Sequence, residues 1–195
     1  FLVPKHLPDG ERNDVALAGL NHKMGYRGTV NTVLNFGETT GAVGWLVGAP
    51  NQGLAAMFHM MNEARVAVGT GAVALGYTGY LKSLDYARTR TQAPPPGAKD
   101  PTAPPVPLVE HADVRRMLLA QKAFVEGGLG LVLYCGKLLD EERTAATPEA
   151  RGRAHVLLEV LTPIAKSWPS QYCLQANDLA IQVHGGYGYT REYDV

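Results

Sequence analysis

The sequence predicts a mainly α protein: an antiparallel four-helix bundle preceded by a partial β-barrel or β-sheet segment. Three observations lead to this prediction. Residues 54–90 contain no proline and repeat apolar side chains at the helical period. Residues 92–107 contain seven prolines and separate that stretch from a second apolar, helix-period stretch. Before residue 50, short β-rich runs alternate with turn signals.

The β segment is predicted from three runs, 1–3, 29–36 and 43–47, of which 29–36 nearly alternates as a half-buried strand does. Four helices are then predicted at 54–90, 108–139, 149–167 and 170–183, and Trp168-Pro169 is expected to end the third. The first would be about 55 Å long at 1.5 Å per residue. Its glycines, among them Gly69, Gly76 and Gly79, predict close approach of neighbouring helices.

The composition suits a globular protein, with 46% hydrophobic residues and eighteen basic against eighteen acidic ones. This balance gives no net field that would attract nucleic acid. Uninterrupted apolar runs, such as 131–134, are far shorter than the roughly 20 residues of a membrane span, so none is predicted. Because the chain begins and ends within elements, we expect a fragment of a longer polypeptide. Its two lone cysteines are expected to be reduced, which predicts a bacterial cytoplasm or, in a eukaryote, the mitochondrial matrix.

Metal chemistry is not indicated. Cys135 and Cys173 lie in helical apolar patterns, which predicts reduced core residues rather than a disulfide framework. The six histidines, at positions 6, 22, 59, 111, 155 and 184, show no metal-ligand spacing. His184 is of interest because it precedes the pair Gly185-Gly186, which would stop a helix, permit positive φ and leave the backbone open to a ligand.

Two other patterns allow more than one interpretation. Gly69, Gly71 and Gly76 lie near a dinucleotide-binding spacing, but they fall inside a helical pattern rather than after a strand, which disfavours that fold. Arg65 follows a methionine-rich apolar turn, together with Asn62 and Glu63. It is either a solvated helix charge or a partner for an anion or carbonyl group.

Four segments together resemble the acyl-CoA dehydrogenase family in order and spacing: Asn-His-Lys-Met-Gly at 21–25, the run Gly-Leu-Ala-Ala-Met-Phe-His-Met-Met-Asn-Glu-Ala-Arg at 53–65, Tyr-Ala-Arg-Thr-Arg-Thr-Gln at 86–92, and Gln-x-x-Gly-Gly-x-Gly-Tyr followed by Glu-Tyr in the tail. The second segment and the insertion after Gln92 look most like the branch that includes 3-methylmercaptopropionyl-CoA dehydrogenase. The resemblance implies that 1–50 is the C-terminal part of the middle β domain. It also implies that 51–195 is the C-terminal four-helix bundle, truncated before its last segment.

The same resemblance implies FAD as cofactor and α,β-dehydrogenation of an acyl-CoA thioester, with electrons passing to an electron-transfer flavoprotein. It further implies a homo-oligomer, dimer or tetramer, in which Arg90 binds the FAD diphosphate of a neighbouring subunit. Gln92, Gln182, Gly185 and Gly186 match cofactor-contacting positions. The aromatic residue that usually follows Gln92 is replaced by Ala93-Pro94. Substrate contacts are implied for Asn62 and Arg65.

No catalytic base is assigned. Most members of the family place a glutamate beyond the position where this chain stops at Val195. A minority place it immediately before the matched arginine, where this chain has Ala64. Glu63 is one residue too early, which rotates a side chain about 100° round a helix and leaves it a weak candidate. We therefore expect the isolated 195-residue chain to be inactive. Two alternatives stay open: an acyl-CoA oxidase that uses oxygen, and a non-catalytic helical interaction module.

Overall fold

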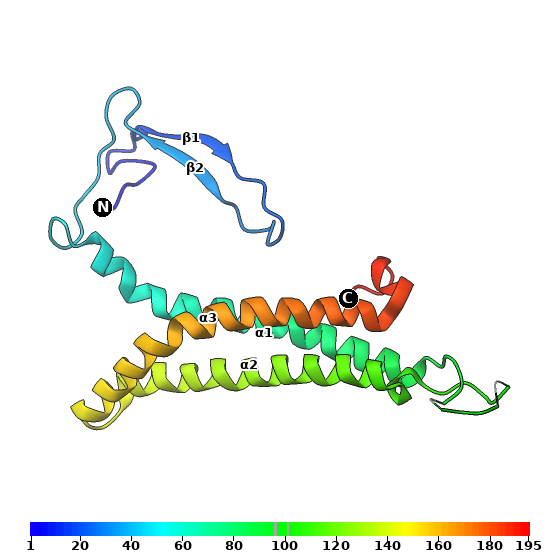
Figure 1. Ribbon diagram of the computed structural model, residues 1–195. Helices are drawn as coiled ribbons and strands as arrows, with labels where there is room; N and C mark the ends of the chain where they lie inside the picture. The colour runs from blue at the N-terminus through cyan, green and yellow to red at the C-terminus, as the bar shows by residue number, and fades with distance from the viewer. Residues whose placement is uncertain (96, 101) are drawn as a thin grey trace. The chain divides into compact units, whose positions relative to one another are not determined.

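The computed structural model describes residues 1–95, 97–100 and 102–195, without the side chain of residue 59. The described chain divides into two compact units, Phe1–Met57 and Phe58–Val195. Figure 1 shows a small strand pair in the first and long helices in the second. The elements in chain order are β1 (Val15–Leu20), β2 (Thr32–Phe36), α1 (Gly53–Thr89), the 3₁₀ turn η1 (Leu108–Glu110), α2 (Ala112–Thr144), α3 (Pro148–His184) and the 3₁₀ turn η2 (Gly185–Tyr189).

In the first unit, β1 and β2 form an antiparallel pair with a bulge between Leu17 and Gly19. The predicted strand at 29–36 is confirmed over Thr32–Phe36, whereas β1 was missed. The runs at 1–3 and 43–47 contribute only the bridge between Leu2 and Trp45, so their prediction as strands was wrong. Among the described residues their pairing stops at this one bridge, and an isolated bridge does not extend into a strand.

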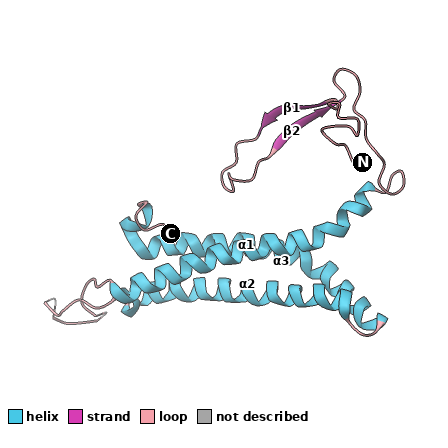
Figure 2. Ribbon diagram, turned by 180° about the vertical axis from the view of Figure 1, so that it is seen from behind, coloured by secondary structure: helices cyan, strands magenta, loops and turns pink. Residues whose placement is uncertain are grey.

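The predicted mainly α character is confirmed, and Figure 2 shows the long helices lying against one another. The first predicted helix is found as α1, with 37 residues, and the second begins a few residues late as α2. The proline-rich stretch between them contains no helix in its described part, with residues 96 and 101 outside the description. Thr147 caps α3 by accepting a hydrogen bond from the Ala150 N–H at 3.2 Å, and Pro148 occupies its first turn.

The predicted break at Trp168-Pro169 was wrong, because α3 runs unbroken through both Pro163 and Pro169. Proline has no N–H, so Pro169 cannot donate to the carbonyl oxygen of Ala165 four residues earlier. Ala165 and Pro169 are both fully buried, and tertiary packing therefore outweighs the local preference to stop. The third and fourth predicted helices are a single helix.

The predicted close approach of helices at glycines is confirmed between α1 and α3. A Cβ added at Gly69 would collide with the carbonyl oxygen of Ala165, and one at Gly76 would lie 2.7 Å from Cβ of Cys173. Gly79 lies against the amide oxygen of Asn177. Around this seam the helices bury two apolar clusters, one containing Val73, Tyr80, Leu118, Val125 and Val132, the other containing Val66, Cys135, Leu138 and Leu158.

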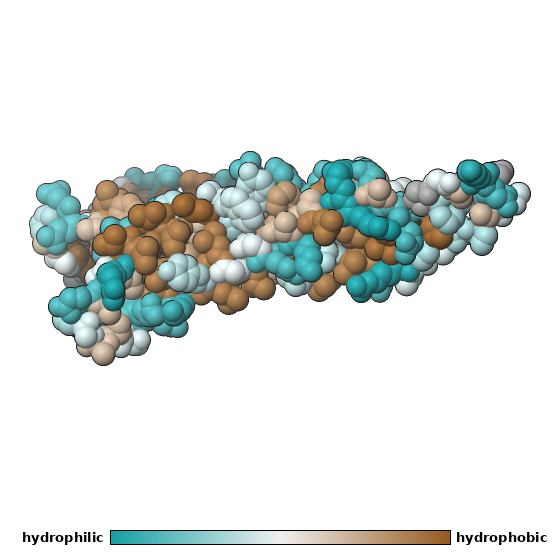
Figure 3. Space-filling model, turned by 60° about the horizontal axis from the view of Figure 1, so that its bottom comes forward, coloured by the Kyte–Doolittle hydropathy of each residue, from teal (hydrophilic) through white to brown (hydrophobic). Residues whose placement is uncertain are grey.

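Helix α2 is long and apolar enough to cross a membrane by length and composition alone, and a third of its most apolar window is buried. Its buried residues, including Val125 and Val132, belong to the core of the bundle. Apolar side chains are also exposed on the bundle, among them Leu133 of α2 and Val160 of α3. Figure 3 shows apolar surface of this kind between polar side chains.

Candidate functional site

A groove lies at one end of the bundle, where α1 ends and α3 turns into η2. Its volume is about 730 Å³, and its lining includes Tyr86, Arg90, Gln92, Gln182, His184, Gly185, Gly186 and Tyr187. All five residues that the sequence assigned to cofactor binding therefore line one groove. They come from segments that lie about ninety positions apart in the chain, which only the packing of α3 against α1 brings together.

Arg90 is held by its backbone and free at its side chain. Its N–H donates to the carbonyl oxygen of Tyr86 at 2.9 Å, and its own carbonyl accepts from the N–H of Leu108 at 2.8 Å. Within the described part of the chain, the Arg90 guanidinium forms no ion pair. A guanidinium offers paired donors that fit a phosphate, so Arg90 is placed and available to bind an anion.

The backbone of Gln92 is fixed from two sides. Its N–H donates to the carbonyl oxygen of Val106 at 3.0 Å, and its carbonyl lies 2.7 Å from Nε2 of His111. The next residue, Ala93, has a φ of +59° and is not part of the groove lining. The chain thus turns away after Gln92, and the position where the family usually has an aromatic residue supplies no contact in this groove.

The bend after α3 leaves its backbone open. Gly185 has a φ of +61°, a conformation that glycine adopts without strain, as the sequence predicted. A Cβ added at Gly185 or Gly186 would meet nothing within 4 Å, whereas one at Gly188 would lie 2.9 Å from Cα of Ile181. Gly188 is therefore required for packing, while the preceding pair leaves open space beside the groove.

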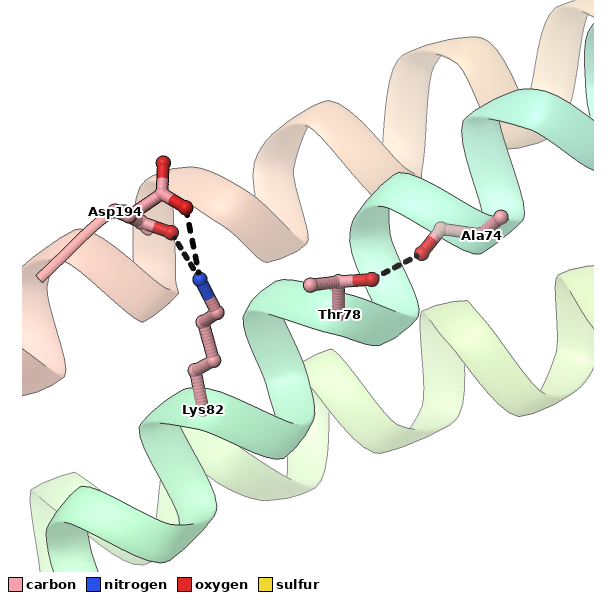
Figure 4. Close-up of polar contacts among 4 residues, drawn as sticks. All are labelled: Ala74, Thr78, Lys82 and Asp194. Carbon is pink, nitrogen blue, oxygen red and sulfur yellow. Dashed lines mark hydrogen bonds and ion pairs between the residues drawn. The ribbon is translucent and has the colours of Figure 1, made fainter.

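Gln182 is oriented by the segment that follows the bend. Its Nε2 donates to the hydroxyl of Tyr189 at 2.8 Å, and this contact does not use the acceptor Oε1. The C-terminal tail is tied back to α1, because Nζ of Lys82 lies 2.6 Å from the carbonyl oxygen of Asp194 and 3.3 Å from its carboxylate (Figure 4).

Sequence reasoning missed the aromatic side chains that support the bend. The ring of His184 stacks on Tyr86 of α1, with centroids 4.5 Å apart and an interplanar angle of 24°. Tyr193 meets the edges of both rings at 5.8 Å and stacks on Tyr187 at 4.7 Å. The tyrosines of the tail were the available signal, since three of them, at 187, 189 and 193, follow the conformationally free turn at Gly185-Gly186.

The residues implied in substrate binding lie near the other end of α1. Asn62 and Arg65 are partly buried there, and the Arg65 guanidinium lies 5.7 Å from the ring centroid of Phe58. Glu63 pairs with Arg143 of α2. A carboxylate held in an ion pair at the bundle surface is a structural contact, which agrees with its weak standing as a catalytic base.

Two other predictions concern metal and thiol chemistry. Among the described side chains, which exclude that of His59, no group of three or more His, Cys, Asp or Glu is arranged to hold a metal ion. Cys135 and Cys173 are free and buried, as predicted, and burial raises the pKa of both thiols. Neither lines the groove.

Comparison with known proteins gives a consistent result. Residues 51–195 match the family described as acyl-CoA dehydrogenase, C-terminal domain. The chain is 39% identical to a butyryl-CoA dehydrogenase of Syntrophomonas wolfei, over 94% of this chain and 31% of that protein. It is 38% identical to the 3-methylmercaptopropionyl-CoA dehydrogenase of Ruegeria pomeroyi, over 100% of this chain and 33% of that protein. It thus spans about a third of the length of these relatives.

Solved structures agree on the fold. The butyryl-CoA dehydrogenase of Megasphaera elsdenii superposes with a TM-score of 0.71 at 20% identity, covering 92% of this chain and 41% of that one. The match to the family covers well over half of the chain, and the groove brings together the residues that the sequence motifs had indicated. The chain belongs to the acyl-CoA dehydrogenase family.

Proposed function

We propose that the chain is part of an FAD-dependent acyl-CoA dehydrogenase, and that its groove binds the pyrophosphate of FAD. The convergence of Arg90 with the Gln182–Gly186 bend in one groove is the observation that supports this proposal. Arg90 supplies charge-assisted donors without a competing carboxylate in the described structure, and the glycine pair lets a ligand approach the backbone. The groove residues thus fit a dianionic, extended ligand.

The enzyme would act as a homo-oligomer in which each groove serves the cofactor of a neighbouring subunit. Arg65 and Arg90 lie 25 positions apart along α1 and its first following residue, which is about 37 Å at 1.5 Å per residue. Two side chains this far apart do not reach one reacting centre. The separation therefore favours a substrate contact at Arg65 and a cofactor contact at Arg90 in two different active sites, which a second copy would complete.

In the reaction we propose, an acyl-CoA thioester would lose a proton from its α carbon and a hydride from its β carbon. Bound FAD would supply the hydride acceptor, and an electron-transfer flavoprotein would receive the electrons. In this reaction the residues of this chain would bind and position the cofactor and the substrate. Arg90, Gln92 and the bend hold the nucleotide half of the cofactor, and Arg65 and Asn62 contact the substrate. Relatives named as butyryl-CoA and 3-methylmercaptopropionyl-CoA dehydrogenases support an acyl-CoA as the substrate class. We assign no base to the described residues.

The test is the flavin content of the whole protein carrying Arg90→Ala, with Arg88→Ala as matched control. Arg88 lies in the last turn of α1, is exposed and does not line the groove. A charge-assisted hydrogen bond is worth about 1.5–3 kcal/mol, so Arg90→Ala should weaken FAD binding by about 10- to 150-fold. Arg88→Ala should change it less than about twofold. Equal flavin content in both variants would refute the proposed site.

A further inference from the structure

The hydrogen-bonding state of His184 follows from its surroundings. Its Nδ1 lies 2.8 Å from the carbonyl oxygen of Ala180, and a carbonyl only accepts, so Nδ1 carries the hydrogen. The side chain is 5% exposed and contacts no carboxylate among the described residues, and a buried cation without a partner is costly. With the hydrogen on Nδ1, the second nitrogen of the neutral imidazole, Nε2, is an acceptor.

This acceptor is held in a fixed orientation. The ring is stacked on Tyr86 and bordered by Tyr193 at an interplanar angle of 67°, so its plane cannot turn without breaking both contacts. Nε2 makes no hydrogen bond within the described structure. The only side-chain atoms there that are both sealed from solvent and unpartnered belong to Gln121 and Asn177. His184 lines the groove, so a ligand bound there would be the group nearest to this acceptor.

The groove consequently presents two complementary features. Arg90 supplies donors for an anion, and His184 requires a donor from the ligand. A nucleoside diphosphate meets both requirements, because its ribose hydroxyl groups lie a few bonds from its phosphates. We propose that Nε2 of His184 accepts a hydrogen bond from a ribose hydroxyl of the adenosine diphosphate half of the cofactor. This inference rests on the proposed function. It identifies the group of the ligand that donates a hydrogen bond to His184 in the same groove.

The experiment compares ligands that differ by one hydroxyl. The whole protein is stripped of flavin, and the affinities of ADP, 2′-deoxy-ADP, 3′-deoxy-ADP and inosine diphosphate are measured by titration calorimetry. The wild type should bind one of the two deoxy analogues about 3- to 10-fold more weakly than ADP, the range expected for one neutral hydrogen bond. Inosine diphosphate, which lacks the adenine amine but keeps both hydroxyls, should bind with the affinity of ADP.

Two variants remove Nε2 in different ways. His184→Phe keeps a ring to stack on Tyr86, and His184→Asn keeps a donor for the Ala180 carbonyl. Either one suffices if it retains the wild-type circular dichroism spectrum. In each, ADP should weaken to the affinity of the deoxy analogue, so that their ratio falls to about one. Arg90→Ala should weaken ADP and its deoxy analogues by the same factor and leave the ratio unchanged.

The outcomes separate the two proposals. Equal binding of ADP and both deoxy analogues by the wild type overturns the role of His184, as does a ratio that survives in either variant that keeps the wild-type circular dichroism spectrum. Weaker binding of inosine diphosphate alone would assign the acceptor to the adenine amine and likewise overturn the ribose contact. If the wild type binds neither FAD nor ADP, the proposed function itself fails.

Discussion

Replacing Gly69 by alanine tests whether the α1–α3 seam determines the stability of the bundle. The added Cβ would collide with the carbonyl oxygen of Ala165 and lie 3.0 Å from its carbonyl carbon. Pro169 cannot donate to that carbonyl, so the oxygen is available to the Cα–H of Gly69, a weak contact that favours close approach. The clash is with backbone, and no side-chain rotation can relieve it.

Two opposing terms set the magnitude. Alanine is about 1 kcal/mol better than glycine in a helix interior. Overpacking a closed helix contact costs about 1–3 kcal/mol, and a backbone collision belongs at or above the top of that range. We therefore expect Gly69→Ala to lower the free energy of unfolding by about 2 kcal/mol. Gly76→Ala should cost less, because the nearest atom to the added Cβ, Cβ of Cys173, would lie 2.7 Å away, a smaller overlap than the one with the Ala165 oxygen.

Gly130→Ala is the matched control. Gly130 lies in the interior of α2, is exposed, and a Cβ there would meet nothing within 4 Å. This variant should gain up to about 1 kcal/mol from helix propensity alone. Urea unfolding followed by far-UV circular dichroism reports on the unit that contains all three long helices. A Gly69→Ala variant as stable as Gly130→Ala would refute the steric argument.

Three further expectations concern polar contacts. A hydrogen bond from His155 to Glu142 raises the pKa of His155, so its contribution to stability is present below pH 6.5 and is lost as the pH rises through the folded-state pKa. The stability difference between wild type and His155→Gln, under about 1 kcal/mol at this exposed site, should therefore shrink between pH 5.5 and 8 in urea titrations. A backbone hydrogen bond from Thr39 and others nearby lower the pKa of Asp14, so Asp14→Asn should lose stability above pH 3.8 and converge with wild type in acid, as amide exchange of Thr39 and Gly41 would show. Lys82→Ala should raise the protease sensitivity of the tail after Tyr189 without altering helix content, and unchanged cleavage would show that its contact with Asp194 does not hold the tail.

Much of the helical unit could be predicted from the sequence. Helices α1 and α2 have a long, proline-free apolar period, and prolines bracket the segment between them, so local signals and tertiary packing agree there. They disagree at Pro169. The local signal predicts a helix end, but the buried contacts of Ala165 and Cys173 with the glycines of α1 keep the helix intact. That information is spread over two helices and is not visible in either alone.

The site shows the same division. Motifs were enough to predict that Arg90, Gln182 and the glycine pair come together, and they do line one groove. The stack of His184 on Tyr86 could not, since it depends on the rotation of α3 relative to α1. Strand β1 was missed for a related reason: its residues are half exposed, and the partner that makes it a strand lies across a loop.

The glycine seam and the groove are parts of one helix face. Successive contacts of α1 with α3 and the tail come from Gly69, Gly76, Gly79, Lys82 and Tyr86, spaced by three, four or seven residues. Such spacing keeps side chains on one side of a helix, and Arg90 follows four residues after Tyr86. The glycines, which come first along the chain, allow α1 and α3 to approach closely. Lys82 and Tyr86, which follow them, contact the tail and His184. Because this face ends at Arg90, a change that separates α1 from α3 at Gly69 should also weaken FAD binding about 20 residues away, although it alters no residue of the groove.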